Sequence, residues 1–262
     1  MTPAEPAFGM HPVAAVGFQQ AAEAYRRGRP DYPAEAVAFI AEVLSLAPGR
    51  RVLDLAAGTG KLTRLLLPFG AGIVAVEPVA AMREALASDL PDVEVHEGRA
   101  EALPLEDGSI DAAVVAQAFH WFDGPAALGE LHRVLRPGST LSLVWNVRDD
   151  EHSAFWSRIT DLMEPYRGDV PSHRSMVWHP FDTTDLFTPP ENRSVPYRHE
   201  TTRDGAVDRV FSTSFIAALP EPERARVREQ VLRLLDEDPD IGPSAERFTL
   251  PYRTDVYWCH RR

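Results

Sequence analysis

Short apolar runs alternate with helix-like segments through the first half of the chain. The runs with the length of a buried strand are residues 52–55, 73–76, 93–96, 110–116 and 141–145. The segments with apolar side chains at helical spacing are residues 34–46, 60–68, 79–88 and 125–135. Because short buried strands that alternate with helices form parallel sheets covered on both faces, the pattern predicts an α/β fold.

The alternation stops after residue 147. Residues 148–200 hold several aromatic residues and prolines in no regular order, and we expect a helical, loop-rich insertion there. Helical spacing returns at residues 205–219 and 221–236, whereas residues 247–261 alternate as a closing strand would. At the other end, the sequence predicts an arm followed by a short helix at residues 18–27.

Composition narrows the classes of protein that fit. The 262 residues are 44% hydrophobic, which allows a sizeable core in one large domain or in a domain with a cap. The net charge of -12 would repel a phosphate backbone, so we expect no nucleic-acid partner. A single cysteine, Cys259, suits a reducing cytoplasm, and no apolar run approaches the ~20 residues that span a bilayer. The one lysine, Lys61, we attribute first to codon usage.

The stretch VLDLAAGTGKLT, residues 52–63, combines a strand, an acid, a glycine turn and a helix start. Glycine permits positive φ and close backbone approach, and a helix start presents free N–H groups to a ligand. A nucleoside triphosphate loop would need glycine where Leu55 stands and serine or threonine where Leu62 follows Lys61. A dinucleotide turn would need glycine or alanine where Thr63 stands. Both patterns fit poorly.

S-adenosylmethionine (SAM) is the third ligand that such a turn could hold. It carries no phosphate, so Asp54 could face its amino-acid end. Glu77, which ends the second apolar run, could accept hydrogen bonds from both ribose hydroxyls. Glu77 does not separate SAM from NAD, because both carry that diol. Simpler roles stay open: a plain turn at Gly58 and Gly60, a helix cap at Asp54 and a solvated charge at Glu77.

Four stretches together resemble the class I SAM-dependent methyltransferases, in particular the small-molecule, methyltransferase-11-like group that includes trans-aconitate-type enzymes. They are VLDLAAGTGKLT, VAVEPVAAM, GRAEALPLEDGSIDAAVVAQAFHWF and RVLRPGSTLSLVWN. The resemblance implies a Rossmann-like fold with a mostly parallel seven-stranded sheet, helices on both faces and a helical insertion or lid. It divides the chain into an arm over the cofactor (1–34), a SAM-binding core (35–147), an insertion at the acceptor site (148–200) and closing helices and strand (201–262).

The resemblance also implies a set of cofactor-binding residues. These are Tyr25, Arg29, Asp54, Ala56, Gly58, Gly60, Glu77, Pro78, Met82, Ala100, Glu101, Ala116 and Gln117. Two positions depart from the family pattern. Ala56 stands where glycine is common, which we expect to be tolerated if its φ stays negative. Arg99 stands where an acid is common, beside the expected adenine site.

His120 follows the fourth apolar run, at the end of the sheet where ligands bind in such folds. We predict that it is a catalytic acid–base, or else a wall of the cleft, and that it contacts the acceptor. Trp121, Trp145 and Arg148 are the other predicted acceptor contacts, and Arg148 could clamp a carboxylate or be a surface charge. The histidines show no metal-ligand spacing, so no metal is expected.

The sequence therefore predicts a cytoplasmic, SAM-dependent methyltransferase that acts on a small-molecule acceptor, such as a carboxylate or hydroxyl compound, and leaves S-adenosylhomocysteine. An NAD(P)-dependent oxidoreductase and a non-catalytic SAM-binding protein are the alternatives. We expect a monomer or homodimer, with neither nucleic acid nor membrane as a partner.

Overall fold

A computed structural model describes residues 29–170, 181 and 184–262 of the chain. The predicted arm, the predicted helix at residues 18–27 and the candidate cofactor residue Tyr25 lie outside these ranges. The rest of the predicted fold can be compared with the structure element by element.

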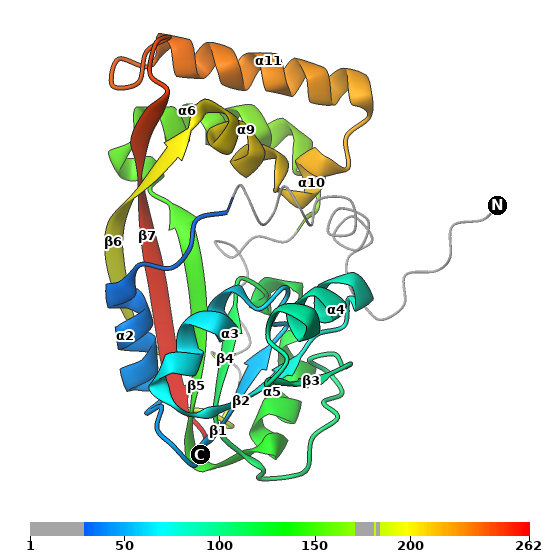
Figure 1. Cartoon of the computed structure of the whole chain (residues 1–262). Helices are drawn as coiled ribbons and strands as arrows, with labels where there is room; N and C mark the ends of the chain where they lie inside the picture. The colour runs from blue at the N-terminus through cyan, green and yellow to red at the C-terminus, as the bar shows by residue number, and fades with distance from the viewer. Residues whose placement is uncertain (1–28, 171–180, 182–183) are drawn as a thin grey trace, which may run out of the picture.

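A seven-stranded sheet runs through the molecule (Figure 1). Its strands are β1 (Arg51–Leu55), β2 (Gly72–Val76), β3 (Glu94–His96), β4 (Ile110–Ala116), β5 (Leu135–Arg148), β6 (Glu191–Thr202) and β7 (Arg247–His260). Their order is β3-β2-β1-β4-β5-β7-β6. The pairs among β1 to β5 are parallel, whereas β7 is antiparallel to both of its neighbours. The predicted Rossmann-like, mostly parallel sheet is confirmed.

Helices cover both faces of this sheet and its extended end. They are α2 (Ala34–Val43), α3 (Lys61–Leu66), α4 (Ala80–Asp89), α5 (Gly124–Val134), α6 (Ala154–Met163), α9 (Arg203–Phe211), α10 (Ser214–Ala217) and α11 (Glu221–Glu237). The helix predicted over residues 205–219 is broken into α9 and α10. None of the helices in the described ranges has both the length and the apolar character needed to cross a bilayer.

Alternation along β1 explains why both faces of the sheet are covered. Leu53 and Leu55 pack with the apolar side of α5, while Val52 packs on the opposite face with α2 and α3. Successive strand side chains point to opposite faces, so an all-apolar strand needs a helix on each side. Asp54 is a polar residue within β1 that is only 1% exposed.

A cap of helices lies beyond the ends of β5, β6 and β7, which are longer than the other strands (Figure 1). α6, α9 and α11 pack there around Leu250 and Tyr252 of β7 in a hydrophobic cluster of their own. The helical insertion predicted for residues 148–200 is wrong over residues 191–200, which belong to β6. β6 is an edge strand whose side chains are mostly exposed, and it contains Pro196, which only an edge strand tolerates.

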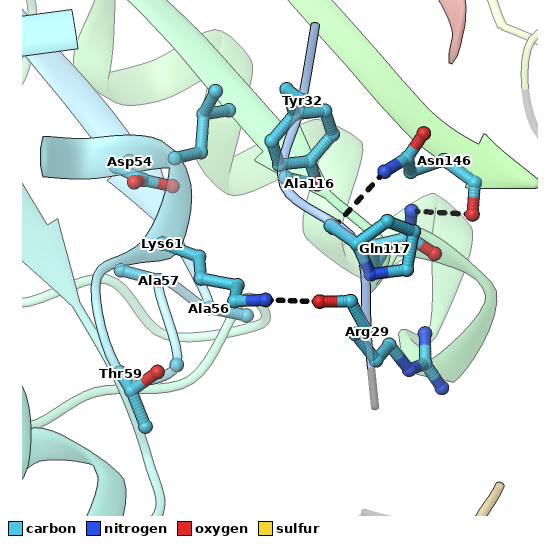
Figure 2. Close-up of a pocket in the computed structure, with 13 residues that line it drawn as sticks. Arg29, Tyr32, Asp54, Ala56, Ala57, Thr59, Lys61, Ala116, Gln117 and Asn146 are labelled. Carbon is cyan, nitrogen blue, oxygen red and sulfur yellow. Dashed lines mark hydrogen bonds between the residues drawn. The ribbon is translucent and has the colours of Figure 1, made fainter. Parts of the chain in front are cut away.

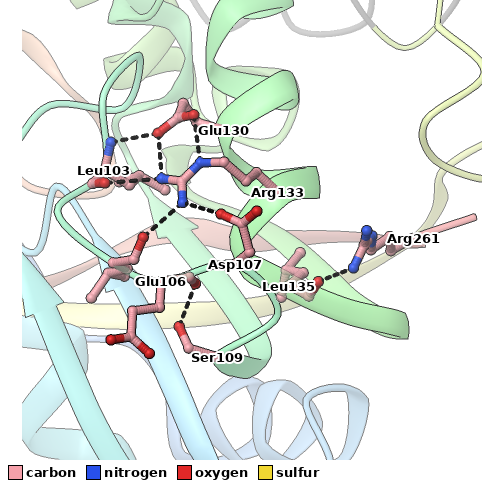
Figure 3. A network of polar contacts seen from close by, with 9 residues as sticks. Leu103, Glu106, Asp107, Ser109, Glu130, Arg133, Leu135 and Arg261 are labelled. Atoms are coloured by element: carbon pink, nitrogen blue, oxygen red, sulfur yellow. Dashed lines mark hydrogen bonds and ion pairs between the residues drawn. The ribbon is translucent and has the colours of Figure 1, made fainter.

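Figure 3 shows a polar network that fixes the loop before β4 to α5. Arg133 donates to the carbonyl oxygens of Leu103 (3.0 Å) and Leu105 (2.7 Å) and to the carboxylates of Glu130 (2.7 Å) and Asp107 (2.8 Å). Glu130 also accepts from the Leu103 backbone N–H at 2.8 Å. We call these five residues the Arg133 bracket. The positive charge of Arg133 is matched by carboxylates on two sides.

Candidate active site

A pocket opens at the carboxyl ends of β1, β4 and β5, where ligands bind in open α/β sheets (Figure 2). It holds about 550 Å³ of empty space, part of it open solvent, which is the size range of small-molecule sites. We call it the cofactor pocket. Its walls are Arg29, Pro30, Tyr32, Asp54, Ala56, Ala57, Gly58, Thr59, Lys61, Leu62, Ala116, Gln117 and Asn146.

Some of the predicted site residues line this pocket and others do not. Six of the predicted cofactor residues line the cofactor pocket: Arg29, Asp54, Ala56, Gly58, Ala116 and Gln117. The other described residues of that set do not line it: Gly60, Glu77, Pro78, Met82, Ala100 and Glu101. The predicted catalytic and acceptor residues are also absent from its lining: His120, Trp121, Trp145 and Arg148.

Two residues that line the pocket have left-handed backbones. Ala56, after β1, has φ 56°, and Gln117, after β4, has φ 60°. The condition under which alanine should be tolerated at position 56, a negative φ, is therefore not met. A left-handed conformation costs a residue with a Cβ roughly 1–2 kcal/mol, so the surrounding structure must hold both residues in place. Strain at the ends of two neighbouring strands is typical of a functional site.

The two glycines of the turn have different tasks. Gly58 has φ 60° and lines the cofactor pocket. Gly60 has φ 76° and begins α3 as its N-cap residue. A Cβ on Gly60 would lie 3.0 Å from Leu90 Cδ1 and 3.1 Å from Leu86 Cγ. Gly60 therefore favours close packing of the turn against α4, and it does not line the cofactor pocket.

Asp54 supplies the pocket with a buried carboxylate. Thr63 donates its hydroxyl to Oδ2 at 2.6 Å, whereas Oδ1 is buried and has no hydrogen-bond partner among the residues that the structure describes. Burial raises the pKa of Asp54 to about 7, and the nearby Glu77 adds to this against the Thr63 bond. A buried acceptor without a donor is costly, so Oδ1 is suited to receive a donor from a ligand.

Glu77 accepts hydrogen bonds from two backbone N–H groups, one of which belongs to the glycine turn. Its Oε2 accepts from the Gly58 backbone N–H and its Oε1 from the Val79 backbone N–H, both at 2.8 Å. Burial raises the pKa of Glu77, and these two bonds oppose the rise. Each carboxylate oxygen has a second lone pair, so Glu77 can still accept from a ligand.

Lys61 and Asn146 hold the start of the described chain over the pocket (Figure 2). Lys61 Nζ donates to the Arg29 carbonyl and pairs with Asp31 at 3.2 Å. Asn146 donates to the carbonyls of Pro30 (3.2 Å) and Asp31 (3.3 Å), and the Gln117 amide donates to the Asn146 carbonyl at 3.2 Å. Neither Lys61 nor Asn146 is in the predicted site, because their pocket role depends on a segment distant in sequence.

The predicted adenine-side residues lie outside the lining of the cofactor pocket. Met82 is buried, and its Sδ would lie 3.9 Å from a Cβ on Gly58. Ala100 is buried in the core beneath α5. Glu101 pairs with Arg99 at 3.1 Å and accepts from the Asp123 backbone N–H at 3.0 Å. Arg99, the departure from the family pattern, therefore has its charge matched by Glu101.

His120 lies in a short 3-10 turn after β4, next to Trp121 and Trp145. The indole N–H of Trp145 donates to His120 Nδ1 at 3.4 Å, and the His120 and Trp121 rings lie 4.8 Å apart. In a neutral ring that accepts at Nδ1, the proton is on Nε2. His120 Nε2 is then a hydrogen-bond donor, which suits orientation of a ligand better than removal of its proton.

Arg148, at the end of β5, is held by α6. Its guanidinium donates to Thr160 Oγ1 and Met163 Sδ, both at 3.2 Å, and lies 5.3 Å from the Trp156 ring centroid. Three partners on one helix fix its direction. Arg148 thus joins the cap to the sheet.

One group of possible metal ligands occurs among the described residues. It consists of Asp149, Glu151 and His152, of which the last two are exposed. His152 Nδ1 contacts Asp149 at 2.9 Å, and none of the three lines the cofactor pocket. Exposed acidic groups of this kind are common without an ion, so we assign no metal there.

Known proteins resemble this chain in sequence and in fold. A family model described as a methyltransferase domain matches residues 53–143. A Mycobacterium tuberculosis protein, named an uncharacterized methyltransferase, is 38% identical over 239 residues, which cover 91% of this chain and 93% of that protein. An uncharacterized methyltransferase-like protein of Schizosaccharomyces pombe is 32% identical over 235 residues, or 89% of this chain and 91% of that one. A solved structure from Anaeromyxobacter dehalogenans, described as a candidate type II methyltransferase, has a TM-score of 0.67 at 24% identity, with 89% and 97% of the two chains covered. The chain belongs to the family of these methyltransferases.

Proposed function

We propose that the protein is a SAM-dependent methyltransferase that acts on a small-molecule acceptor in the cytoplasm, as a monomer or homodimer. The observation that carries the proposal is Asp54 Oδ1, a buried oxygen that lines the cofactor pocket and has no donor among the described residues. An ammonium group is the ligand feature that such an oxygen favours, and SAM has one at its amino-acid end.

The same carboxylate argues against a dinucleotide. A pyrophosphate at the start of α3 would lie close to Asp54, and two anions in a poorly solvated pocket repel each other. The glycine turn also lacks the third small residue that a dinucleotide turn uses, because Thr63 stands there and is committed to Asp54. An oxidoreductase therefore fits these residues less well than a methyltransferase.

The residues of the pocket would bind SAM and exclude water from it. Asp54 would accept from the ammonium group, and Glu77 would accept from the ribose hydroxyls while it holds Gly58 in place. Ala116 and Gln117 would lie beside the methionine portion, and the segment held by Lys61 and Asn146 would cover it. When bound, SAM supplies a methyl group on a positively charged sulfur.

Alignment is the main demand that methyl transfer places on the protein. Holding two reactants in line can supply ~7–11 kcal/mol of the barrier. A carboxylate acceptor needs no base because it is already ionised, whereas a hydroxyl acceptor needs a group that removes its proton. His120 is our candidate for that group or, through Nε2–H, for orientation of the acceptor.

Isothermal titration calorimetry with SAM, S-adenosylhomocysteine and NADH tests the cofactor. We expect the two adenosyl ligands to bind and NADH to bind far more weakly. Turnover is then followed as release of S-adenosylhomocysteine with a panel of carboxylates, phenols, alcohols and amines. Tight NADH binding without SAM binding would reject the proposal, and SAM binding with no turnover would leave a non-catalytic SAM-binding protein.

A further inference from the structure

Arg209 is a buried arginine in the last turn of α9, inside the cap. It is only 9% exposed. Its Nη1 donates to Ser212 Oγ at 3.4 Å, and its neighbours Ala206, Val207 and Val210 on α9 pack in one cluster with Tyr252. Its Nε is buried without a hydrogen-bond partner, and no carboxylate within the described ranges pairs with it. A buried cation that lacks an anionic partner is strongly destabilising, so it needs a reason to be there.

Two observations, one of charge and one of packing, connect Arg209 with the cofactor pocket. Burial lowers the pKa of Lys61, Asp31 opposes this, and the charges of Arg29 and Arg209 lower it further. The charge of Arg209 thus acts on the Lys61 amine, and Lys61 lines the pocket. The second connection runs through Tyr252 and Tyr197, whose rings are stacked.

Burial raises the pKa of Tyr252, and the charge of Arg209 opposes this rise. Tyr252 stacks on Tyr197 with ring centroids 5.7 Å apart. The Tyr197 hydroxyl donates to Asn146 Oδ1 at 2.9 Å, and Asn146 lines the pocket. These tyrosines thus connect α9, the cap helix that carries Arg209, with the wall of the pocket; Figure 1 shows α9 in the cap.

Positive charge accumulates at this junction in a chain whose net charge is -12. Arg29 and Arg209 act on both Lys61 and Tyr252, so the three cations share one region. The carboxylate that pairs with Lys61 is Asp31, whose side chain is 74% exposed and thus well screened by water. A cluster of cations beside a low-dielectric pocket attracts anionic small molecules.

We propose that Arg209 is a specificity-determining residue that binds an oxyanion of the methyl acceptor, most favourably a carboxylate. The inference rests on the proposed function and adds the substrate class to it. A planar guanidinium matches the two oxygens of a carboxylate, and a phosphate monoester offers the same chemistry. The acceptor supplies the anion that the cap arginine lacks, and Lys61 with Arg29 adds attraction at the entrance.

A paired panel of acceptors tests this inference through turnover. Each small carboxylic acid is offered beside its neutral amide of the same shape, and phosphate monoesters form a third arm. We expect acids or phosphate esters to be methylated with kcat/KM at least ~30-fold above that of the amides. Arg209→Gln should raise KM for the best anion at least ~10-fold and leave the Kd of S-adenosylhomocysteine unchanged. Arg228→Gln is the control, because Arg228 lies on α11, exposed and paired with Asp204 at 3.6 Å.

Equal turnover of acids and amides, or an unchanged KM in Arg209→Gln, would overturn the inference. Arg209→Lys keeps the charge without the planar fork, and it should restore part of the anion affinity. If S-adenosylhomocysteine does not bind the unmodified protein, the proposed function fails instead. The two failures are thus distinguishable.

Thermal unfolding separates a ligand-binding arginine from a structural one without any turnover. With S-adenosylhomocysteine present, succinate or inorganic phosphate should raise Tm of the unmodified protein, and neutral succinamide should not. Arg209→Gln should abolish that rise. It should also leave Tm of the ligand-free protein unchanged or higher, because it removes an unmatched buried charge. A fall of Tm by more than ~5 °C would show a structural role and contradict the inference.

Discussion

The Arg133 bracket and the cofactor pocket differ in how completely their polar groups are paired. Arg133 donates to two carbonyl oxygens and two carboxylates, and its partner Glu130 also holds a backbone N–H. In the pocket, Asp54 Oδ1 has no donor within the described part of the chain, and Ala56 and Gln117 keep strained backbones. Among the residues that the structure describes, no carboxylate pairs with the cap arginine Arg209.

The difference shows how structural and ligand-binding polar groups can be told apart. A polar group whose bonds are all satisfied within the fold contributes to stability. A buried group left short of partners costs stability, and it is kept where a ligand completes it. Substitutions in the bracket should therefore change stability alone, whereas those in the pocket should change ligand affinity and stability in opposite directions.

Glu77→Ala should have the largest effect, because Glu77 both pairs with backbone N–H groups of the fold and is a proposed ligand contact. Its loss leaves the N–H groups of Gly58 and Val79 without their acceptor and should cost about 2–4 kcal/mol of unfolding free energy. Affinity for S-adenosylhomocysteine should fall at least ~10-fold. Urea unfolding and calorimetry measure the two effects, and unchanged affinity would remove Glu77 from the site.

Arg133→Ala should lower stability by about 2 kcal/mol and leave ligand affinity unchanged. The bracket ties the loop to α5 away from the cofactor pocket, so its removal should act only on the folded state. Arg136→Ala is a matched control, since Arg136 is an exposed arginine paired with Asp111, and it should cost less than ~1 kcal/mol. If Arg133→Ala is fully folded and still loses affinity for S-adenosylhomocysteine, the distinction between the bracket and the pocket is wrong.

Asp54→Asn should weaken cofactor binding ~10-fold or more and yet stabilise the free protein. The pKa of Asp54 is about 7 in the folded state against an ordinary 3.8, so the folded state binds its proton more tightly. Its contribution to stability is therefore present at low pH and is lost as the pH rises through about 7. The variant avoids that loss and should be more stable by about 1–3 kcal/mol above pH 7, with no gain near pH 4.

The same substitution gives a pH test of binding. Affinity of the unmodified protein for S-adenosylhomocysteine should rise as the pH passes about 7, because an ionised Asp54 is needed for the ammonium group. In Asp54→Asn this dependence should vanish. A pH dependence that persists in the variant would assign it to another group.

Ala56→Gly should have the smallest effect. Glycine removes the penalty of φ 56° but costs entropy, so the net gain should be below ~1 kcal/mol. Ala57→Gly is the control at the neighbouring pocket residue, where φ is not positive, and it should lose about 0.5–1 kcal/mol. Chemical unfolding of both variants shows whether the backbone at Ala56 is strained.

The central sheet and its glycine turn were predictable because their signals are local. Strands such as β1 and β4 are apolar on both faces, which marks buried parallel strands, and an acid before two glycines marks a ligand turn. β6 could not be found this way, because an edge strand carries polar side chains and Pro196 without penalty.

The rest of the site depends on contacts between distant segments. Lys61 donates to the Arg29 carbonyl and Asn146 to the Pro30 carbonyl. Because every residue has a backbone carbonyl, the sequence does not indicate which one a side chain will bind. That no carboxylate among the described residues pairs with Arg209 can be recognised only in the folded cap. Predicted roles for His120, Trp121, Trp145 and Arg148 stay predictions.

A crystal structure of the complex with S-adenosylhomocysteine tests the central claim most directly. The account predicts the ligand in the pocket at the ends of β1, β4 and β5, with its amino nitrogen within hydrogen-bond distance of Asp54 Oδ1. A ligand bound elsewhere, or one whose amino group points away while Oδ1 stays without a donor, would contradict it.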